Sequence, residues 1–69
     1  MTLKELREAV ARNQVEVAAE CRVSTTTVSA WERGAVKPRL IHVRELARIY
    51  HVTIAEINSA IAETEKQSG

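Results

Sequence analysis

Apolar residues recur at helical spacing along most of the chain, three or four positions apart, and each run marks one face of a helix. The apolar positions are, in chain order, Leu3, Leu6 and Val10; Val17, Ala18 and Cys21; Val28 and Trp31; Leu40, Val43, Leu46, Ala47 and Tyr50; and Ile54, Ile57 and Ile61. The pattern predicts an all-α fold, a compact bundle of four to five short helices.

Polar residues in front of these runs mark where the helices begin. In a capping box, the N-cap side chain and a Glu three positions later bond to each other's backbone N–H. Three pairs fit this pattern: Thr2 with Glu5, Asn13 with Glu16, and Thr53 with Glu56. Ser24 is the expected cap of another helix. Gly34 can end that helix in a left-handed conformation, and Pro38 disfavours a helix before Arg39.

The second and third predicted helices, about 14–21 and 25–33, are separated by a turn of only about three residues. Such a connection is typical of a helix-turn-helix. We expect residues 1–62 to form this domain. Residues 63–69, ETEKQSG, are expected to be a polar C-terminal tail that frays.

The composition agrees with one small helical domain. The chain has 69 residues, of which 45% are hydrophobic and 3% aromatic, with two Gly and one Pro. These values fit neither a β-sandwich nor a disordered tail. The single Cys cannot form an internal disulfide. The start, TLKELRE, lacks the apolar run of a signal peptide, and no stretch approaches the ~18 apolar residues of a membrane span, so we expect a cytoplasmic protein.

Charge is sorted by region although the net charge is only +1. Five cations, Arg33, Lys37, Arg39, Arg44 and Arg48, surround one acid, Glu45, while residues 56–65 carry only acids. A basic region of this kind is compatible with binding to nucleic acid.

No group of residues indicates catalysis, a cofactor or a bound metal. The two His, one Cys and nine carboxylates show no metal-ligand spacing, and the chain has neither a Gly-rich phosphate loop nor a nucleophile with a base at hand. His42 is expected to be a surface residue of its helix. Cys21 is expected to be a small core residue rather than a redox sensor. The sequence therefore argues against an enzyme.

The run from Ser24 to Ala30, STTTVSA, is unusual because Thr is a weak helix former. Small hydroxyl residues on an exposed face allow a backbone to approach DNA closely, donate to phosphates or bases, and contact thymine through a methyl group. The alternative is a soluble surface whose side chains bond locally to the backbone. The run alone does not decide between the two.

The chain resembles the Cro/phage-repressor (Xre-type) helix-turn-helix family from residue 2 to about 58. The matching pieces are Leu3-x-x-Leu6-Arg7; Asn13-Gln14-x-Glu16-Val17-Ala18; Val23-Ser24-x-x-Thr27-Val28-Ser29-x-Trp31-Glu32-Arg33-Gly34; Pro38; Leu46-Ala47; and Val52-Thr53. The resemblance implies a lambda-repressor-like domain whose third helix, the recognition helix, lies in the major groove. It also implies a homodimer on a palindromic operator in double-stranded DNA.

The resemblance also implies roles for individual residues. Gln14 matches a Gln that contacts a phosphate and props the recognition helix, and helix N-termini suit anions. Base-reading positions are Thr25, Thr26 and Ala30, flanked by Ser24, Thr27 and Ser29. Arg33, Lys37 and Arg39 match a loop that grips the DNA backbone, with solvated surface charge as the alternative. Trp31 and Val28 are implied to be core residues, and Glu32 a structural residue that pairs with an Arg.

The sequence departs from the family pattern in three ways. Arg22 and His51 occupy positions where relatives commonly have Gly, so a left-handed conformation at either residue has a cost. Ala11-Arg12 replaces a Gly-hydrophobic pair, so the junction between the first two helices is expected to differ from that of the family. The reading face also lacks Arg, Gln and Asn, the side chains that discriminate bases by paired hydrogen bonds. Specificity is then expected to be modest per protomer, or to depend on shape, water and dimer spacing.

These features favour a sequence-specific transcriptional regulator of the repressor type. We expect its dimer surface at Ile54, Ile57 and Ile61, with Ile41 as a further candidate, unless these isoleucines belong to the core. Two alternatives stay open. An antitoxin of the same fold would also bind a toxin, and a protein-interaction module would have lost DNA binding.

Overall fold

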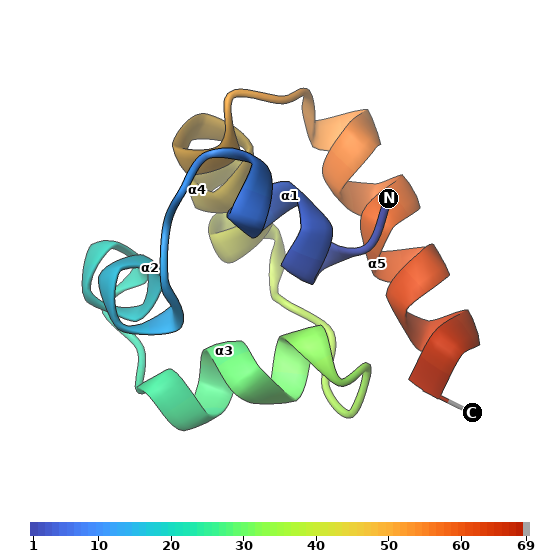
Figure 1. The fold of residues 1–69 in the computed structure, drawn as a ribbon, viewed down its shortest axis with the longest axis horizontal. Coiled ribbons are helices and arrows are strands. Elements are labelled where there is room, and N and C mark those ends of the chain that lie inside the picture. Colours follow the sequence, from blue (N-terminus) through green and yellow to red (C-terminus); the bar gives the residue numbers. More distant parts are fainter. Residues whose placement is uncertain (69) are drawn as a thin grey trace.

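The computed structural model describes residues 1–68 and consists of five helices, with no strand in that range. They are α1 (Leu3–Ala9), α2 (Gln14–Cys21), α3 (Thr25–Glu32), α4 (Leu40–Tyr50) and α5 (Ile54–Ser68). Figure 1 shows α2 and α3 at one side of the bundle and α5 at the other, next to α1. The predicted all-α helix-turn-helix fold is confirmed. No helix within residues 1–68 has the length and apolar character needed to cross a membrane.

The predicted caps begin four of the five helices. Complete capping boxes start α1 and α2, with both reciprocal hydrogen bonds present in each. Ser24 Oγ accepts the backbone N–H of Thr27 at the start of α3. Thr53 and Glu56 bond each other's backbone N–H at the start of α5. The exception is α4, whose N-cap Arg39 makes no side-chain cap bond.

A single core lies between the helices and contains most of the predicted apolar positions. Leu40 and Ile54 are exceptions, because their side chains are 59% and 42% exposed. Val17 of α2, Val28 of α3, Leu46 of α4 and Ile57 of α5 are almost completely buried. Trp31 is 3% exposed and is a core residue, as the family resemblance implied. Burial of these side chains is the main favourable term that holds so short a chain together.

The isoleucines proposed for a dimer surface divide into two groups. Ile57 is fully buried and Ile61 packs partly against the core, so the expectation that Ile57 faces a partner is wrong. It lies on the inner face of α5, where it fills the space against the other helices. Ile54 is 42% exposed and Ile41 is 63% exposed, so both side chains remain accessible.

Three residues other than Gly adopt left-handed backbone conformations at the ends of helices. Ala11, Arg22 and His51 have φ of 56°, 57° and 57°. In each case a Cβ comes close to a backbone carbonyl oxygen, at a cost of roughly 1–2 kcal/mol per residue. The chain therefore follows the left-handed turns without the Gly residues that would relieve this strain.

The expected polar tail is wrong for residues 63–68, because α5 continues through Ser68. The reason is Thr64, which is 3% exposed and continues the buried face of Ile57 and Ala60. Its Oγ1 donates to the carbonyl of Ala60 (2.7 Å) and accepts the backbone N–H of Leu3 (3.0 Å). These bonds attach the last turns of α5 to the start of α1. Residue 69 lies outside the described residues.

Candidate nucleic-acid interface

The helix-turn-helix is built by two short helices that bury one face each. Val17, Ala18 and Cys21 of α2 and Val28 and Trp31 of α3 point into the core. Between the helices, Arg22 takes the left-handed conformation, and Val23 N–H bonds back to the carbonyl of Ala18 (3.0 Å). This tight reversal leaves the opposite face of α3 on the outside of the molecule.

The first four residues of the run from Ser24 to Ala30 all carry hydroxyls, which fall into two sets. Ser24 and Thr27 bond to each other through their hydroxyls (2.9 Å), and Ser24 also caps the helix. For this pair, the alternative of a soluble surface with local hydrogen bonding applies, although both hydroxyls lie at the surface. Thr25 and Thr26 are exposed, and within residues 1–68 their hydroxyls make no hydrogen bond. Those two hydroxyls are therefore available to a ligand.

The outer face of α3 is shallow because its side chains are short. Thr26 and Ala30 are four residues apart and share a ridge, and Thr25 and Ser29 form a second ridge beside it. Ser29 and Ala30 are half-buried. A flat, small-residue face of this kind lets the helix backbone approach another surface closely.

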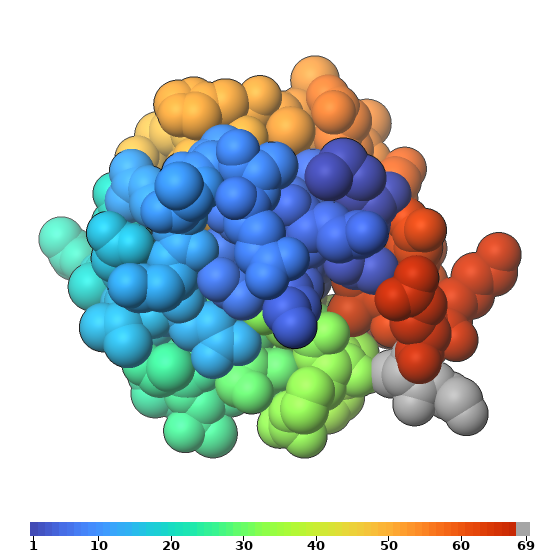
Figure 2. Space-filling model, viewed as in Figure 1, coloured from blue at the N-terminus to red at the C-terminus, as the bar shows by residue number. Residues whose placement is uncertain are grey.

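Cations lie beyond both ends of α3. Arg33, Lys37 and Arg39 are exposed in the connection from α3 to α4, and Lys37 Nζ lies 3.7 Å from Glu65 Oε2 of α5. Arg22, at the other end of the helix, is also exposed, and the sequence did not identify it as a site residue. Figure 2 shows α3 and the following loop, in green and yellow-green, as one continuous edge of the molecule.

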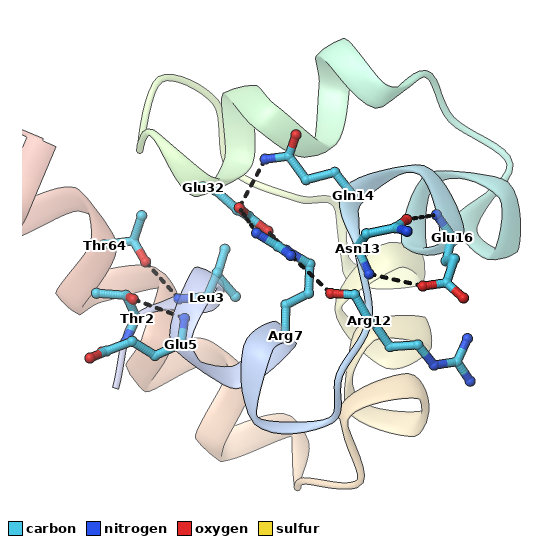
Figure 3. A network of polar contacts seen from close by, with 10 residues as sticks. All are labelled: Thr2, Leu3, Glu5, Arg7, Arg12, Asn13, Gln14, Glu16, Glu32 and Thr64. Carbon is cyan, nitrogen blue, oxygen red and sulfur yellow. Dashed lines mark hydrogen bonds and ion pairs between the residues drawn. The ribbon is translucent and has the colours of Figure 1, made fainter.

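Gln14 belongs to a partly buried polar network that joins three helices (Figure 3). Its Nε2 donates to Glu32 Oε1 (3.0 Å), while Arg7 Nε donates to Glu32 Oε2 (2.7 Å) and Arg7 Nη2 to Glu32 Oε1 (3.1 Å). Arg7 Nη1 also donates to the backbone carbonyl of Arg12 (2.9 Å). The side chains of Arg7 and Glu32 are only 11% and 6% exposed. The hydrogen bonds that Arg7 donates to Glu32 raise the pKa of Arg7.

This network fixes the start of α2 against the end of α3. The structural role predicted for Glu32, pairing with an Arg, is confirmed, and its partner is Arg7 of α1. The amide oxygen of Gln14 points away from Glu32 in Figure 3. Gln14 is therefore held by the network through its Nε2, and its amide oxygen lies on the side away from Glu32.

His42 and Cys21 take no part in this surface. His42 is half-buried rather than a surface residue, with its Nδ1 2.9 Å from Glu45 Oε1 and its ring centroid 5.2 Å from that of Trp31. Cys21 is 2% exposed, and burial raises the pKa of its thiol to about 11, which fits the predicted core role. Over residues 1–68, no group of three or more His, Cys, Asp or Glu could hold a metal ion.

Comparison with known proteins agrees with this geometry. A family model described as helix-turn-helix matches residues 3–57, which is most of the chain. Neither a curated protein nor a solved structure matches. The matched range contains the α2-turn-α3 unit, the loop that carries Arg33, Lys37 and Arg39, and the first turn of α5.

Proposed function

The chain belongs to the Cro/phage-repressor (Xre-type) helix-turn-helix family of DNA-binding regulators, and from this membership we propose that it is a transcriptional repressor. It binds a palindromic operator in double-stranded DNA as a homodimer. The observation that carries the proposal is the outer face of α3, which presents only short side chains and is flanked by exposed cations.

In this proposal α3 enters the major groove. A groove about 12 Å wide admits one helix, and short side chains allow the deepest entry. Thr25, Thr26 and Ala30 face the base edges. Ser24, Thr27 and Ser29 lie at the sides of the helix, where a hydroxyl can also reach a phosphate.

Phosphate contacts come from both sides of α3. Arg33, Lys37 and Arg39 grip one stretch of backbone, while Gln14 and the N-terminal N–H groups of α2 face another. Binding that neutralises roughly three to five phosphates per protomer gives a slope of log K against log salt of about −2.7 to −4.5 per protomer.

Dimerisation places two copies of α3 in successive major grooves, with half-sites about one helical turn apart. The two isoleucines that remain accessible, Ile54 at the start of α5 and Ile41 in α4, are the proposed contacts. Mutation of either to Lys is expected to reduce dimerisation while the helical content stays unchanged, because neither side chain is buried in the core.

The test is selection of bound duplexes from a random DNA pool at near-physiological salt, followed by affinity measurements against salt concentration. Enrichment of an inverted repeat with a steep slope supports the proposal. No enrichment, with binding that disappears by ~0.2 M salt, refutes it. A partner protein bound without such a slope would then indicate an interaction module. Operator binding together with binding of a toxin would instead indicate an antitoxin.

A matched pair of variants locates the interface. Arg33→Ala with Arg39→Ala removes two cations beside α3, and the salt slope is expected to become shallower by about two. Arg44→Ala with Arg48→Ala removes the same charge from the exposed side of α4 and is expected to leave the slope nearly unchanged. Equal effects of the two double variants would contradict the proposed orientation.

A further inference from the structure

The outer face of α3 carries no side chain that can form paired hydrogen bonds to a base. Such pairs are made by Arg or Lys with guanine and by Asn or Gln with adenine, and Glu and Asp accept from cytosine. The helix reads TTTVSAWE, and its one acid, Glu32, is buried and held by Arg7 and Gln14. Arg33 follows only at the C-terminal cap. The face must discriminate bases by some other chemistry.

The groups that this face does present are methyl groups and single hydroxyls. The hydroxyls of Ser24 and Thr27 are already bonded to each other. Thr26 and Ala30 place two methyl groups one helical turn apart on the same ridge, and the methyl of Thr25 lies beside them. A single hydroxyl on Thr25 or Thr26 can donate to or accept from any base, so it carries little sequence information.

The apolar group that a base exposes in the major groove is the C5-methyl group of thymine. We infer that α3 reads pyrimidine C5-methyl groups through the methyl groups of Thr26 and Ala30, with Thr25 beside them. The inference rests on the proposed function and adds the chemical group by which the operator is recognised. The half-site therefore has thymines at the positions that face this ridge.

The experiment uses the full chain and the best duplex from the selection, with deoxyuridine in place of thymine at one position at a time. This exchange removes only the C5-methyl group and keeps base pairing. At contacted positions we expect affinity to fall about threefold to fivefold, the value for burial of one methyl group. Cytosine at the same position weakens binding. Replacing that cytosine by 5-methylcytosine is expected to raise the affinity again by about threefold to fivefold.

Two variants assign the effect to α3. Thr26→Ser removes one methyl group and keeps the hydroxyl, so it is expected to weaken binding to the thymine duplex and to leave binding to the corresponding uracil duplex unchanged. Thr26→Val keeps a methyl group and is expected to retain the discrimination. Thr53→Ser removes a methyl group at the start of α5, on the opposite side of the molecule in Figure 1, and is expected to change neither affinity.

The outcomes separate the inference from the proposed function. If every uracil duplex binds like its thymine parent while the salt slope stays steep, the inference is wrong and the DNA-binding function stands. If uracil weakens binding equally in the wild type and in Thr26→Ser, the methyl group is not read by Thr26, and the assignment is overturned. If no duplex shows a steep salt slope, both proposals fail. Thermal melting of each variant checks that the fold is intact.

Discussion

The buried ion pair of Arg7 and Glu32 gives the sharpest test of how this domain is held together. We consider Glu32→Gln, which removes the negative charge and keeps the volume of the side chain. The charged side chain of Arg7 then remains largely buried and faces a neutral amide. The amide has one acceptor oxygen instead of two, so it can accept only part of the hydrogen bonds that Arg7 donates. Gln14 also loses a charged acceptor.

The magnitude follows from the geometry. Two N–H donors of Arg7 contact the two carboxylate oxygens at 2.7 and 3.1 Å, and both side chains are close to 90% buried or more. Breaking a buried pair by removing one partner costs about 3–5 kcal/mol, because the other charge is left uncompensated. A domain of 69 residues is stable by about 3–10 kcal/mol. We therefore expect Glu32→Gln to remove a large part of the stability.

The assay is urea unfolding followed by far-UV circular dichroism and by the fluorescence of Trp31. Glu20→Gln is the matched control, because Glu20 pairs with Arg12 at 2.9 Å but the two side chains are 36% and 35% exposed. An exposed pair contributes about 0–1 kcal/mol, so the control should unfold nearly as the wild type does.

A double variant completes the test. Arg7→Met with Glu32→Leu removes both charges, and replacement of a buried pair by hydrophobic residues of similar size is often neutral or stabilising. We expect it to recover most of the stability lost in Glu32→Gln. The reasoning is refuted if Glu32→Gln costs no more than Glu20→Gln, or if the double variant is less stable than the single one.

Three further predictions concern the core and the turns. Trp31→Ala is expected to cost about 3–5 kcal/mol and to leave the chain largely unfolded by circular dichroism, because the side chain is 3% exposed. Arg22→Gly is expected to raise the urea midpoint by the equivalent of about 0.5–1 kcal/mol, since relief of left-handed strain exceeds the entropy cost of Gly. Burial raises the pKa of Cys21 from 9.0 to about 11, so its neutral thiol stabilises the fold below pH 9 and this contribution is lost as pH rises toward 11. Between pH 9 and pH 11, the unfolding free energy of Cys21→Ala should therefore fall by about 3 kcal/mol less than that of the wild type, as measured by urea unfolding at each pH.

The sequence predicted the helices well because their signals are local. Each capping box lies within four residues, and each buried face repeats every three or four positions. The polar tail was misjudged although a signal existed. Thr64 lies four residues after Ala60 and seven after Ile57, which continues the buried face of α5. A hydroxyl that bonds to the carbonyl four residues earlier can remain on such a face.

The partners of the polar network could not be predicted in the same way. Arg7 and Glu32 are 25 residues apart, and Leu3 and Thr64 are 61 apart. Spacing within a helix cannot show which distant side chains will meet, since this depends on how the helices pack. The sequence indicated that Glu32 pairs with an Arg, but the chain has several Arg residues and only the fold distinguishes Arg7.

The network also connects stability with the shape of the proposed DNA surface. Core packing fixes how far apart α2 and α3 lie. The hydrogen bonds that Arg7 and Gln14 donate to Glu32 fix how Gln14 is oriented at the start of α2. A purely apolar replacement can therefore restore the free energy of unfolding without restoring this orientation. In Arg7→Met with Glu32→Leu, the amide of Gln14 has no acceptor at position 32. The side chain of Gln14 can then rotate in the free protein, and its phosphate contact must first order it. We expect this variant to be stable yet to bind DNA more weakly than the wild type. Wild-type affinity in the double variant would mean that the ion pair serves the fold alone.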